Sequence, residues 1–458
     1  PICMNKLTII VTYYNAEEYI TGCLESIKQQ RTQDFNLIIV NDGSTDQSKK
    51  LMDEAIKDYD KNIRFIDLDE NSGHAHARNI ALEEVETPYF MFLDADDELA
   101  SYAITFYLEK FNNTDGLIAP IHSFTTQRPQ FVDLDRVRVE YFNAKENINS
   151  FLRKQSACNI IFRTAIVRAH HIRFNENLNT YVDWSFVLEY MKYVNKFVRI
   201  FNFPFYFRGE VYDPFETLTL SEQNFDILFK DYVNSFYDAI KRATNPKVRE
   251  FIVTKMGNKI ANEFEPTRYD INERYQTHKD TLVELSKFLH VHLVKNQKLI
   301  NKIETILLMN NETDKAFKVN QFRKTLRHVK NIVLRRKNKE RSLYDLTDKE
   351  DNVKPKTIVF ESFGGKNYSD SPKYIYEYMQ KYYPNYRYIW SFKNPDKNVV
   401  PGSAEKVKRN SAEYYQAYSE ASHWVSNART PLYLNKKENQ TYIQTWHGTP
   451  LKRLANDM

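Results

Sequence analysis

The sequence is poor in glycine, poor in cysteine and without long apolar runs. Its 458 residues include 10 glycines, about 2% against an average near 7%, so each glycine beside polar residues is worth inspecting. The three cysteines, Cys3, Cys23 and Cys158, are too far apart for a metal motif or a disulfide framework, which favours a reducing compartment. No apolar run reaches the roughly 18 residues of a membrane span, and LTIIV is too short for a signal peptide. We therefore expect a cytoplasmic protein.

The charge balance is also mild. Lys and Arg total 65 and Asp and Glu total 60, and the net charge of +5 is too small to indicate a nucleic-acid partner by itself. Hydrophobic residues at 42% and charged residues at 27% are typical of a folded globular protein and exclude disordered and collagen-like chains. At roughly 100–200 residues per domain, the length predicts two to four domains.

Short apolar runs alternate with amphipathic stretches from residue 5 to about residue 125. This alternation predicts a parallel sheet covered by helices. Ligands of such sheets bind beyond the carboxyl ends of the strands. The expected strands are Leu7–Val11, Phe35–Val40, Ile63–Asp67 and Tyr89–Leu93, and the expected helices are Ala16–Gln30, Gln47–Tyr59 and His76–Val85.

The rest of the chain changes character twice. The pattern turns helical from about residue 223, and the polar, acidic residues 343–355 read as a linker. From Thr357 a second strand–helix alternation runs to the terminus. The fold class is therefore α/β, with three expected parts: residues 5–222, a helical region 223–343, and residues 356–458.

Polar clusters follow three successive strands of the first sheet. Asn41–Asp46 follows the second strand, Asn71–Gly73 the third and Asp94–Glu98 the fourth. Carboxylates one residue apart in a loop can hold a divalent cation together with a diphosphate, and Asp42 can accept a hydrogen bond from a base N–H. For the last cluster alone, a solvated acidic loop is an equally good interpretation. The joint occurrence at consecutive strand ends favours a nucleotide site.

The segments VTYYNAEEYITGCLESIKQQ, VNDGSTDQS, NSGHAHARN and FLDADDE resemble, in this order, the family-2 glycosyltransferases of the GT-A fold. The resemblance covers residues 5–100 and implies a UDP-sugar donor and Mg²⁺ or Mn²⁺ as cofactor. It implies that Asp94 and Asp96 are the DxD motif that holds the metal on the diphosphate, with Asp96 the surer ligand. Thr12 is a departure, because such enzymes often carry Pro there. The residues implied to line the uridine pocket are Tyr14, Asp42, Asn71 and Arg78.

A general base has to remove a proton from the acceptor hydroxyl. Asp183 stands where the family carries an acidic pair, with Val182 in place of the first acid, so the resemblance implies that Asp183 is the base. The alternative is that Asp183 only caps the helix that begins there. Arg208 and Thr217–Thr219 loosely resemble a diphosphate clamp, and Arg208 is implied to bind the nucleotide-sugar.

A histidine lies in the string QTWHGTPLK near the end of the chain. Together with ESFGGKNYSDSPKYIYEYM, YRYIWSFKNP and VKRNSAEYYQAYSEASHWVSN, this string resembles the CDP-glycerol glycerophosphotransferases that polymerise teichoic acid. The resemblance covers roughly residues 356–458 and implies that His447 is the base toward an acceptor glycerol. It also implies a partial Rossmann-like domain, half of a GT-B pair, without the CDP-glycerol pocket. We therefore expect a fragment of a longer bifunctional polypeptide.

The segment Lys318–Arg341 combines ten Lys and Arg residues with apolar residues at helical spacing. Such a helix can lie on an anionic membrane. The alternative is a solvated helix whose apolar stripe packs on a neighbouring domain, and no recognition motif supports a nucleic-acid partner. The apolar residues are Phe322, Leu326, Val329 and Val333.

The sequence thus predicts an inverting transfer of a sugar from a UDP-sugar to a teichoic-acid-type or other lipid-linked polyol phosphate. The enzyme would be attached peripherally to the inner face of the cell membrane. The alternatives are an enzyme of capsule or other surface polysaccharide assembly, and a non-catalytic, membrane-attached scaffold.

Overall fold

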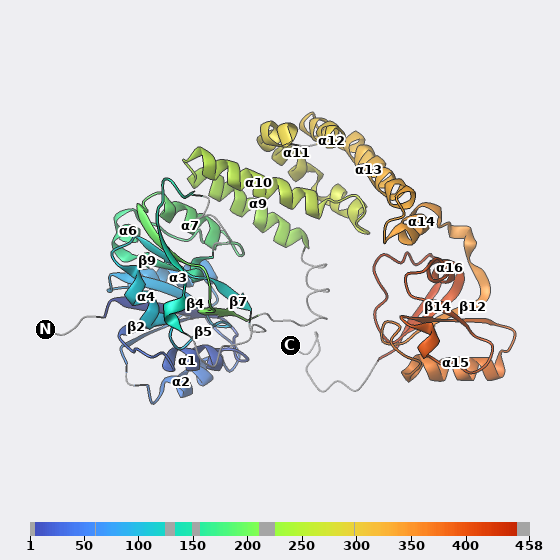
Figure 1. The fold of residues 1–458 in the computed structure, drawn as a ribbon, viewed down its shortest axis with the longest axis horizontal. Coiled ribbons are helices and arrows are strands. Elements are labelled where there is room, and N and C mark those ends of the chain that lie inside the picture. Colours follow the sequence, from blue (N-terminus) through green and yellow to red (C-terminus); the bar gives the residue numbers. More distant parts are fainter. Residues whose placement is uncertain are drawn as a thin grey trace. The chain divides into compact units, whose positions relative to one another are not determined.

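The computed structural model describes residues 5–59, 61–123, 133–148, 156–209, 225–296 and 298–446. The chain divides into two compact units, residues 1–258 and 259–458 (Figure 1). The expected division into three parts stays a prediction. No helix among the described residues is long and apolar enough to cross a bilayer.

The first unit is built on an eight-stranded mixed sheet. Its strand order is β3-β2-β1-β4-β9-β6-β10-β8. The pairs among β3, β2, β1 and β4 are parallel, whereas β9 is antiparallel to both β4 and β6. The strands are β1 (Leu7–Tyr13), β2 (Phe35–Asn41), β3 (Ile63–Asp67), β4 (Tyr89–Asp94), β6 (Gly116–Ile118), β8 (Val139–Asn143), β9 (Ile160–Arg163) and β10 (Lys196–Ile200).

The first seven elements follow the alternation that the sequence predicts. The helices between the parallel strands are α1 (Ile20–Lys28), α2 (Ser48–Ile56) and α3 (His74–Glu83). Every residue of β1 is buried, as expected for a central strand that is covered on both faces. The chain runs from β1 to β2 on one side of it and reaches β4 on the other. Ligands of open α/β sheets bind at such a reversal of strand order.

A small second sheet brings distant segments to the end of β4. Its order is β5-β11-β7, and it joins β5 (Glu98–Leu99), β11 (Tyr206–Arg208) and β7 (Ile121–Ser123). Because β5 directly follows the acidic loop, β11 lies beside that loop. The remaining helices of this unit include α4 (Ala103–Phe111), α6 (Thr164–Ala169), α7 (Asp183–Met191) and α9 (Phe225–Arg242), and α10 (Pro246–Glu263) ends just beyond it.

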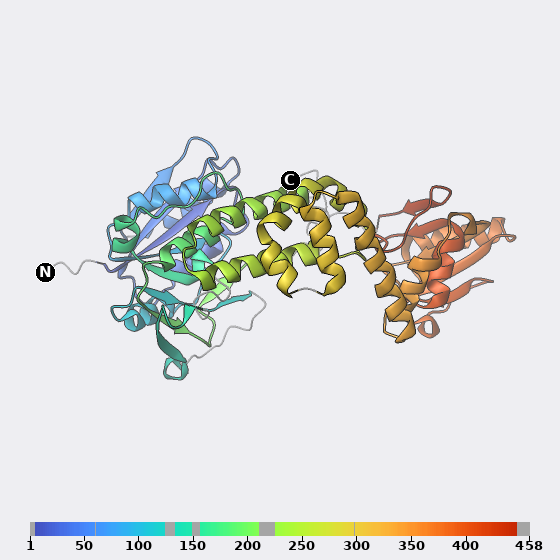
Figure 2. The same cartoon turned by 90° about the horizontal axis from the view of Figure 1, so that it is seen from above.

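The second unit contains helices and a parallel sheet. Its five-stranded sheet has the order β14-β13-β12-β15-β16, and all its pairs are parallel. This is the expected Rossmann-like arrangement, and its strands and helices are seen from a second side in Figure 2. The strands are β12 (Lys354–Glu361), β13 (Arg387–Phe392), β14 (Glu405–Lys408), β15 (Ala421–Ser426) and β16 (Thr441–Gln444). The helices are α11 (Ile271–Asn296), α12 (Leu299–Met309), α13 (Thr313–Val333), α14 (Lys339–Thr347), α15 (Asp370–Tyr382) and α16 (Ala412–Glu420).

Candidate active site

Asp42, at the end of β2, is a buried carboxylate that holds the loop after β3. Its two oxygens accept hydrogen bonds from the backbone N–H groups of Ser72 at 2.8 Å and Gly73 at 3.0 Å. The neighbouring Gly43 has φ +67° and lies so close to this loop that a Cβ would be 2.3 Å from the carbonyl carbon of Glu70. The glycine therefore permits the contact between the second and third polar clusters.

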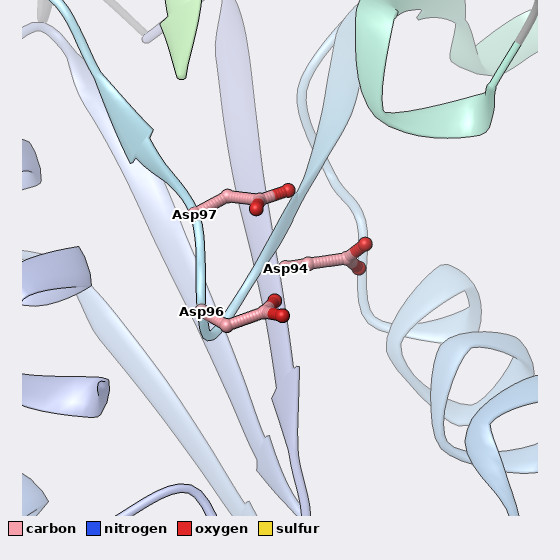
Figure 3. A group of neighbouring side chains, drawn as sticks. All are labelled: Asp94, Asp96 and Asp97. Carbon is pink, nitrogen blue, oxygen red and sulfur yellow. The ribbon is translucent and has the colours of Figure 1, made fainter. Parts of the chain in front are cut away.

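The three aspartates after β4 point their carboxylates to the same side of the loop (Figure 3). Asp94, Asp96 and Asp97 each offer an oxygen within 4.8 Å of the others. Burial, and then the charge of Asp94, raise the pKa of Asp96, and the same two causes raise the pKa of Asp97 to about 7. Raised pKa values mean that the negative charges are not fully compensated by protein groups, so a cation between them would be stabilised.

Asp97 accepts hydrogen bonds from protein groups on both of its carboxylate oxygens. The hydroxyl of Tyr206 on β11 donates to one oxygen, and the backbone N–H of Gly209 donates to the other at 2.9 Å. Asp97 therefore fastens β11 to the acidic loop. Asp94 and Asp96 remain the better candidates for metal ligands, as the sequence predicts.

Arg78 on α3 is the central cation of the site. Its side chain is 1% exposed and donates to Asp183 at 2.5 Å, to Asp94 at 2.8 Å and to the Cys158 sulfur at 3.3 Å. Its guanidinium carbon lies 4.9 Å from the ring centre of Phe92. Burial opposes the charged form, but the charges of Asp183 and Asp94 outweigh it and raise the pKa.

Asp183 begins α7 and is held from three directions. Its second oxygen accepts hydrogen bonds from the Ser156 hydroxyl and the Ala157 N–H, both at 2.9 Å. Although burial opposes ionisation, the charge of Arg78 and the Ala157 N–H lower the pKa to about 2. The N-terminus of α7 has no side-chain cap, with Val182 at the N-cap position. Asp183 is thus directed at Arg78, and the structure gives no support to the helix-cap interpretation.

The remaining expected residues lie outside this buried centre. Tyr14 is 45% exposed, and exposed Asn71 accepts a hydrogen bond from the Gly73 N–H at 3.1 Å. Arg208 is exposed at the end of β11 and donates to the Ser156 hydroxyl at 3.2 Å. The expected place of Arg78 in the uridine pocket with Tyr14 and Asn71 stays a prediction; in the structure its guanidinium contacts Asp94 and Asp183. His447 and Thr217–Thr219 lie outside the described residues.

His74, Ser156 and Tyr206 complete the site, and none of them is among the expected site residues. His74 contacts the Thr12 hydroxyl at 3.3 Å and lies 3.8 Å from Asp94. Burial, and then the charge of Arg78, lower its pKa to about 4, so it is neutral at pH 7. Ser156 and Tyr206 are polar residues without a motif, and no signal in the sequence points to them.

Two family models match this chain. Residues 8–172 match glycosyl transferase family 2. Residues 343–458 match CDP-Glycerol:Poly(glycerophosphate) glycerophosphotransferase. Both resemblances that the motifs indicate are confirmed.

Several of the proteins similar in sequence are enzymes of teichoic acid. The chain is 46% identical over 111 residues to the teichoic acid poly(glycerol phosphate) polymerase of Bacillus subtilis. This alignment covers 23% of this chain and 14% of the polymerase. It is 28% identical over 201 residues to the poly(ribitol-phosphate) beta-N-acetylglucosaminyltransferase TarS of Staphylococcus aureus, covering 41% of this chain and 32% of that one. The matches to this polymerase, to its counterpart in Bacillus spizizenii and to the teichoic acid glycerol-phosphate transferase of S. aureus span 14–27% of the length of those proteins.

Two solved structures align with parts of this chain. A crystal structure of S. aureus TarS 1–349 in complex with UDP aligns with a TM-score of 0.51 at 18% identity, covering 69% of this chain and 90% of that one, and shows a shared fold. A structure of the wall teichoic acid polymerase TagF aligns at 99% identity and a TM-score of 0.30, covering 31% of this chain and 34% of that one.

Proposed function

We propose that this chain, a family-2 glycosyltransferase domain of the GT-A fold joined to a CDP-glycerol glycerophosphotransferase domain, transfers a sugar from a UDP-sugar to a teichoic-acid-type polyol phosphate. The observation that carries the proposal is the contact of one buried arginine, Arg78, with both Asp94 and Asp183. Asp94 is assigned to the metal and the donor diphosphate, and Asp183 is assigned to the proton of the acceptor hydroxyl. Arg78 therefore links the donor side of the proposed reaction to the acceptor side.

The UDP-sugar donor is supported by the polar strand ends and by the likeness to TarS. Asp42 is buried and already orders the Asn71–Gly73 loop, which gives a fixed polar rim beyond β2 and β3. Exposed Tyr14 and Asn71 supply an aromatic ring and an amide at this rim. The related TarS has been solved with UDP and with UDP-GlcNAc, and we propose the same class of donor here.

The acidic loop fits Mg²⁺ or Mn²⁺. These hard cations prefer carboxylate oxygens, and Asp94 and Asp96 offer oxygens within 4.8 Å of each other. The charge of Asp96 is incompletely compensated, whereas the pKa of Asp94 is lowered because the charge of Arg78 outweighs burial and keeps this carboxylate ionised. Bound there, the ion would neutralise charge on the departing diphosphate. Arg208, exposed beside the loop, adds a second cation for the same phosphates.

Asp183 is proposed to accept the proton of the acceptor hydroxyl. It is ionised at neutral pH, as a base must be, but with a pKa of about 2 it binds a proton weakly while all its donors are in place. The acceptor hydroxyl would take the place of the Ser156 hydroxyl as a donor to this carboxylate, which aligns its proton for transfer. Attack from this side, with the diphosphate leaving on the side of Asp94, inverts the configuration at the sugar.

A binding measurement tests the nucleotide and metal part of the proposal. We expect UDP to bind the full chain in calorimetry with Mn²⁺ and at least tenfold more weakly in EDTA. We expect Asp96→Asn to lose the effect of Mn²⁺. The matched control is Asp69→Asn, which removes an exposed carboxylate outside the acidic loop and should change nothing. UDP binding that is indifferent to Mn²⁺ would refute the assigned metal site.

The two alternatives are separated by simple observations. A scaffold would release no UDP from any UDP-sugar, whereas a transferase hydrolyses its donor slowly without an acceptor. An enzyme of another surface polysaccharide would hydrolyse the donor but would not use a polyol phosphate chain as acceptor. The match of residues 343–458 to a glycerophosphotransferase family favours the teichoic acid acceptor. We also propose His447 as the base of that second activity.

Membrane contact through residues 318–341 is proposed on the surface of α13. Its apolar residues face outward, with Phe322 57% and Val333 71% exposed. Its inward face is polar, because buried His328 and Asn331 contact the Ser342 hydroxyl at 3.0 and 3.1 Å. Polar groups inside and apolar groups outside, among many cations, suit a helix that lies on an anionic bilayer.

A further inference from the structure

Three aromatic side chains and a lysine gather next to Asp183, on the side of α7 that faces α9 and α10. We call Tyr181, Trp184, Tyr232 and Lys255 the aromatic–lysine group. The ring centres of Tyr181 and Tyr232 are 5.1 Å apart, and those of Trp184 and Tyr232 are 6.0 Å apart. The Lys255 ammonium lies 5.3 Å from the ring centre of Trp184. The group therefore forms one continuous surface within the first unit.

Tyr181 is held in a backbone conformation that a tyrosine rarely adopts. Its φ is +57°, and its side chain is 41% exposed. The turn is fastened to α9, since Ser235 donates to the Tyr181 carbonyl at 2.9 Å and Thr180 donates to Asp231 at 3.1 Å. Such strain persists where the surroundings impose it, often at ligand sites. Here it presents an exposed ring two residues before the proposed base.

Lys255 is a cation whose counter-charge is not supplied by the described residues. No carboxylate of the described chain lies within 4.0 Å of its ammonium, which instead lies over the rings of Trp184 and Phe251. Although the residue is exposed, burial by its neighbours is enough to lower its pKa. A partly desolvated ammonium without a carboxylate is stabilised by a bound anion.

The anion that this position fits belongs to the acceptor and not to the donor. Successive residues of a helix point about 100° apart, so Trp184 points to a different side of α7 from Asp183. Lys255, which lies over Trp184, is therefore on a different side of α7 from the contact of Asp183 with Arg78. Donor phosphates already have Arg208 and the acidic loop. The rings offer flat apolar surface for C–H groups, and the ammonium offers charge for a phosphate.

We propose that the aromatic–lysine group binds the phosphate and adjoining polyol of the acceptor, with Lys255 on the phosphate and the rings of Tyr181 and Trp184 on the polyol carbons. This inference rests on the proposed function and adds the residues that select a charged acceptor. It places the acceptor hydroxyl of a neighbouring unit within reach of Asp183. An uncharged glycan would lack the partner of Lys255.

The test measures binding of a synthetic glycerol phosphate hexamer to the full chain by calorimetry, with UDP and Mn²⁺ present. Lys255→Gln should weaken binding at least tenfold and lower its salt dependence. Lys247→Gln removes an equally exposed charge from the same helix and should change nothing. Equal affinities of these two variants would overturn the proposal, as would equal binding of inorganic phosphate and the hexamer.

Tyr181 allows binding to be separated from folding. Asn and Gly tolerate positive φ, so Tyr181→Asn should leave the melting temperature unchanged or raise it while the hexamer binds at least fivefold more weakly. Where a UDP-sugar supports transfer, both this variant and Lys255→Gln should raise the KM for the hexamer with little change in kcat. Hexamer binding unaffected by Tyr181→Asn would overturn the role of the ring. If the wild-type chain hydrolyses no UDP-sugar yet binds the hexamer through Lys255, the proposed function fails and the acceptor site stands.

Discussion

Arg78→Met should destabilise the first unit by about 3 kcal/mol at pH 7. The substitution keeps the volume between Phe92 and Phe174 but leaves Asp94 and Asp183 without their shared cation. Removing one partner of a buried ion pair costs about 3–5 kcal/mol. Both carboxylates keep roughly a third of their side-chain surface, so we expect the lower end of this range.

The pH dependence gives an independent value for part of this loss. The pKa of Asp183 is lowered from 3.8 to about 2, which corresponds to about 2 kcal/mol of stability. Because the pKa is lowered on folding, this contribution is present in full above pH 3.8 and is lost as the pH falls through 2. The difference between wild type and Arg78→Met should therefore shrink as the pH is lowered from 5 toward 2.

The assay is urea-dependent hydrogen–deuterium exchange read by mass spectrometry, because a chain of two units need not unfold in one step. Peptides of β1 to β4 report the site, and peptides of β12 to β15 serve as an internal control. Arg173→Met is the matched variant, since it breaks the more exposed pair with Glu83 and should cost less than about 1 kcal/mol. A loss below about 1 kcal/mol for Arg78→Met, or one that is the same at pH 7 and pH 3, would refute the reasoning.

Two further predictions concern the loops and the membrane. Gly43→Ala should lower the stability of the first unit by at least about 1–3 kcal/mol in the same exchange assay, because it adds a clash with Glu70 to the strain of positive φ. Gly73→Ala is the control: its added Cβ meets no atom within 4 Å, so this substitution should cost less. The double variant Phe322→Ser/Leu326→Ser removes exposed apolar surface and should reduce flotation with anionic vesicles at least tenfold. The triple variant Arg335→Glu/Arg336→Glu/Lys337→Glu should also reduce flotation at least tenfold, since each lost Lys or Arg removes about 1 kcal/mol of attraction to the anionic surface. Val399→Ser removes an apolar side chain of the second unit that is even more exposed but lies outside residues 318–341, and it should float like the wild type. Unchanged flotation of both variants of residues 318–341 would exclude the proposed contact.

The first four strands of the first sheet and their parallel arrangement could be predicted from the sequence. The expected strands agree with β1 to β4 to within two residues, since continuous apolar runs are typical of strands buried on both faces. The polar clusters lie at the same edge of the sheet because β2, β3 and β4 run parallel, with β1 between β2 and β4. The same reasoning identified the second parallel sheet that begins near Thr357.

The contacts of Arg78 could not be predicted in this way. The motif suggested a place near the nucleobase, in the uridine pocket. The direction of the Arg78 side chain, however, depends on packing between Phe92 and Phe174, which are 82 residues apart in sequence. Asp183, 105 residues beyond Arg78, comes to it only through the antiparallel half of the sheet. Long-range packing of this kind leaves no local pattern.

The surface of α13 shows a second limit of sequence patterns. Apolar spacing at Phe322, Leu326 and Val329 predicts a helix, and the helix is present. The same spacing would equally suit an inward-facing stripe. Only the buried His328 and its contact with Ser342 reveal that the apolar side faces outward.

The role of Asp183 as the base is tested most directly by the effect of Asp183→Asn on two quantities in the same preparation. We expect transfer from the UDP-sugar to a glycerol phosphate acceptor to fall at least a hundredfold, because the amide cannot accept the proton. We expect the affinity for UDP with Mn²⁺ to change less than threefold, because Asp94 still holds Arg78. Retained transfer, or loss of UDP binding together with transfer, would contradict the role of Asp183 as the base.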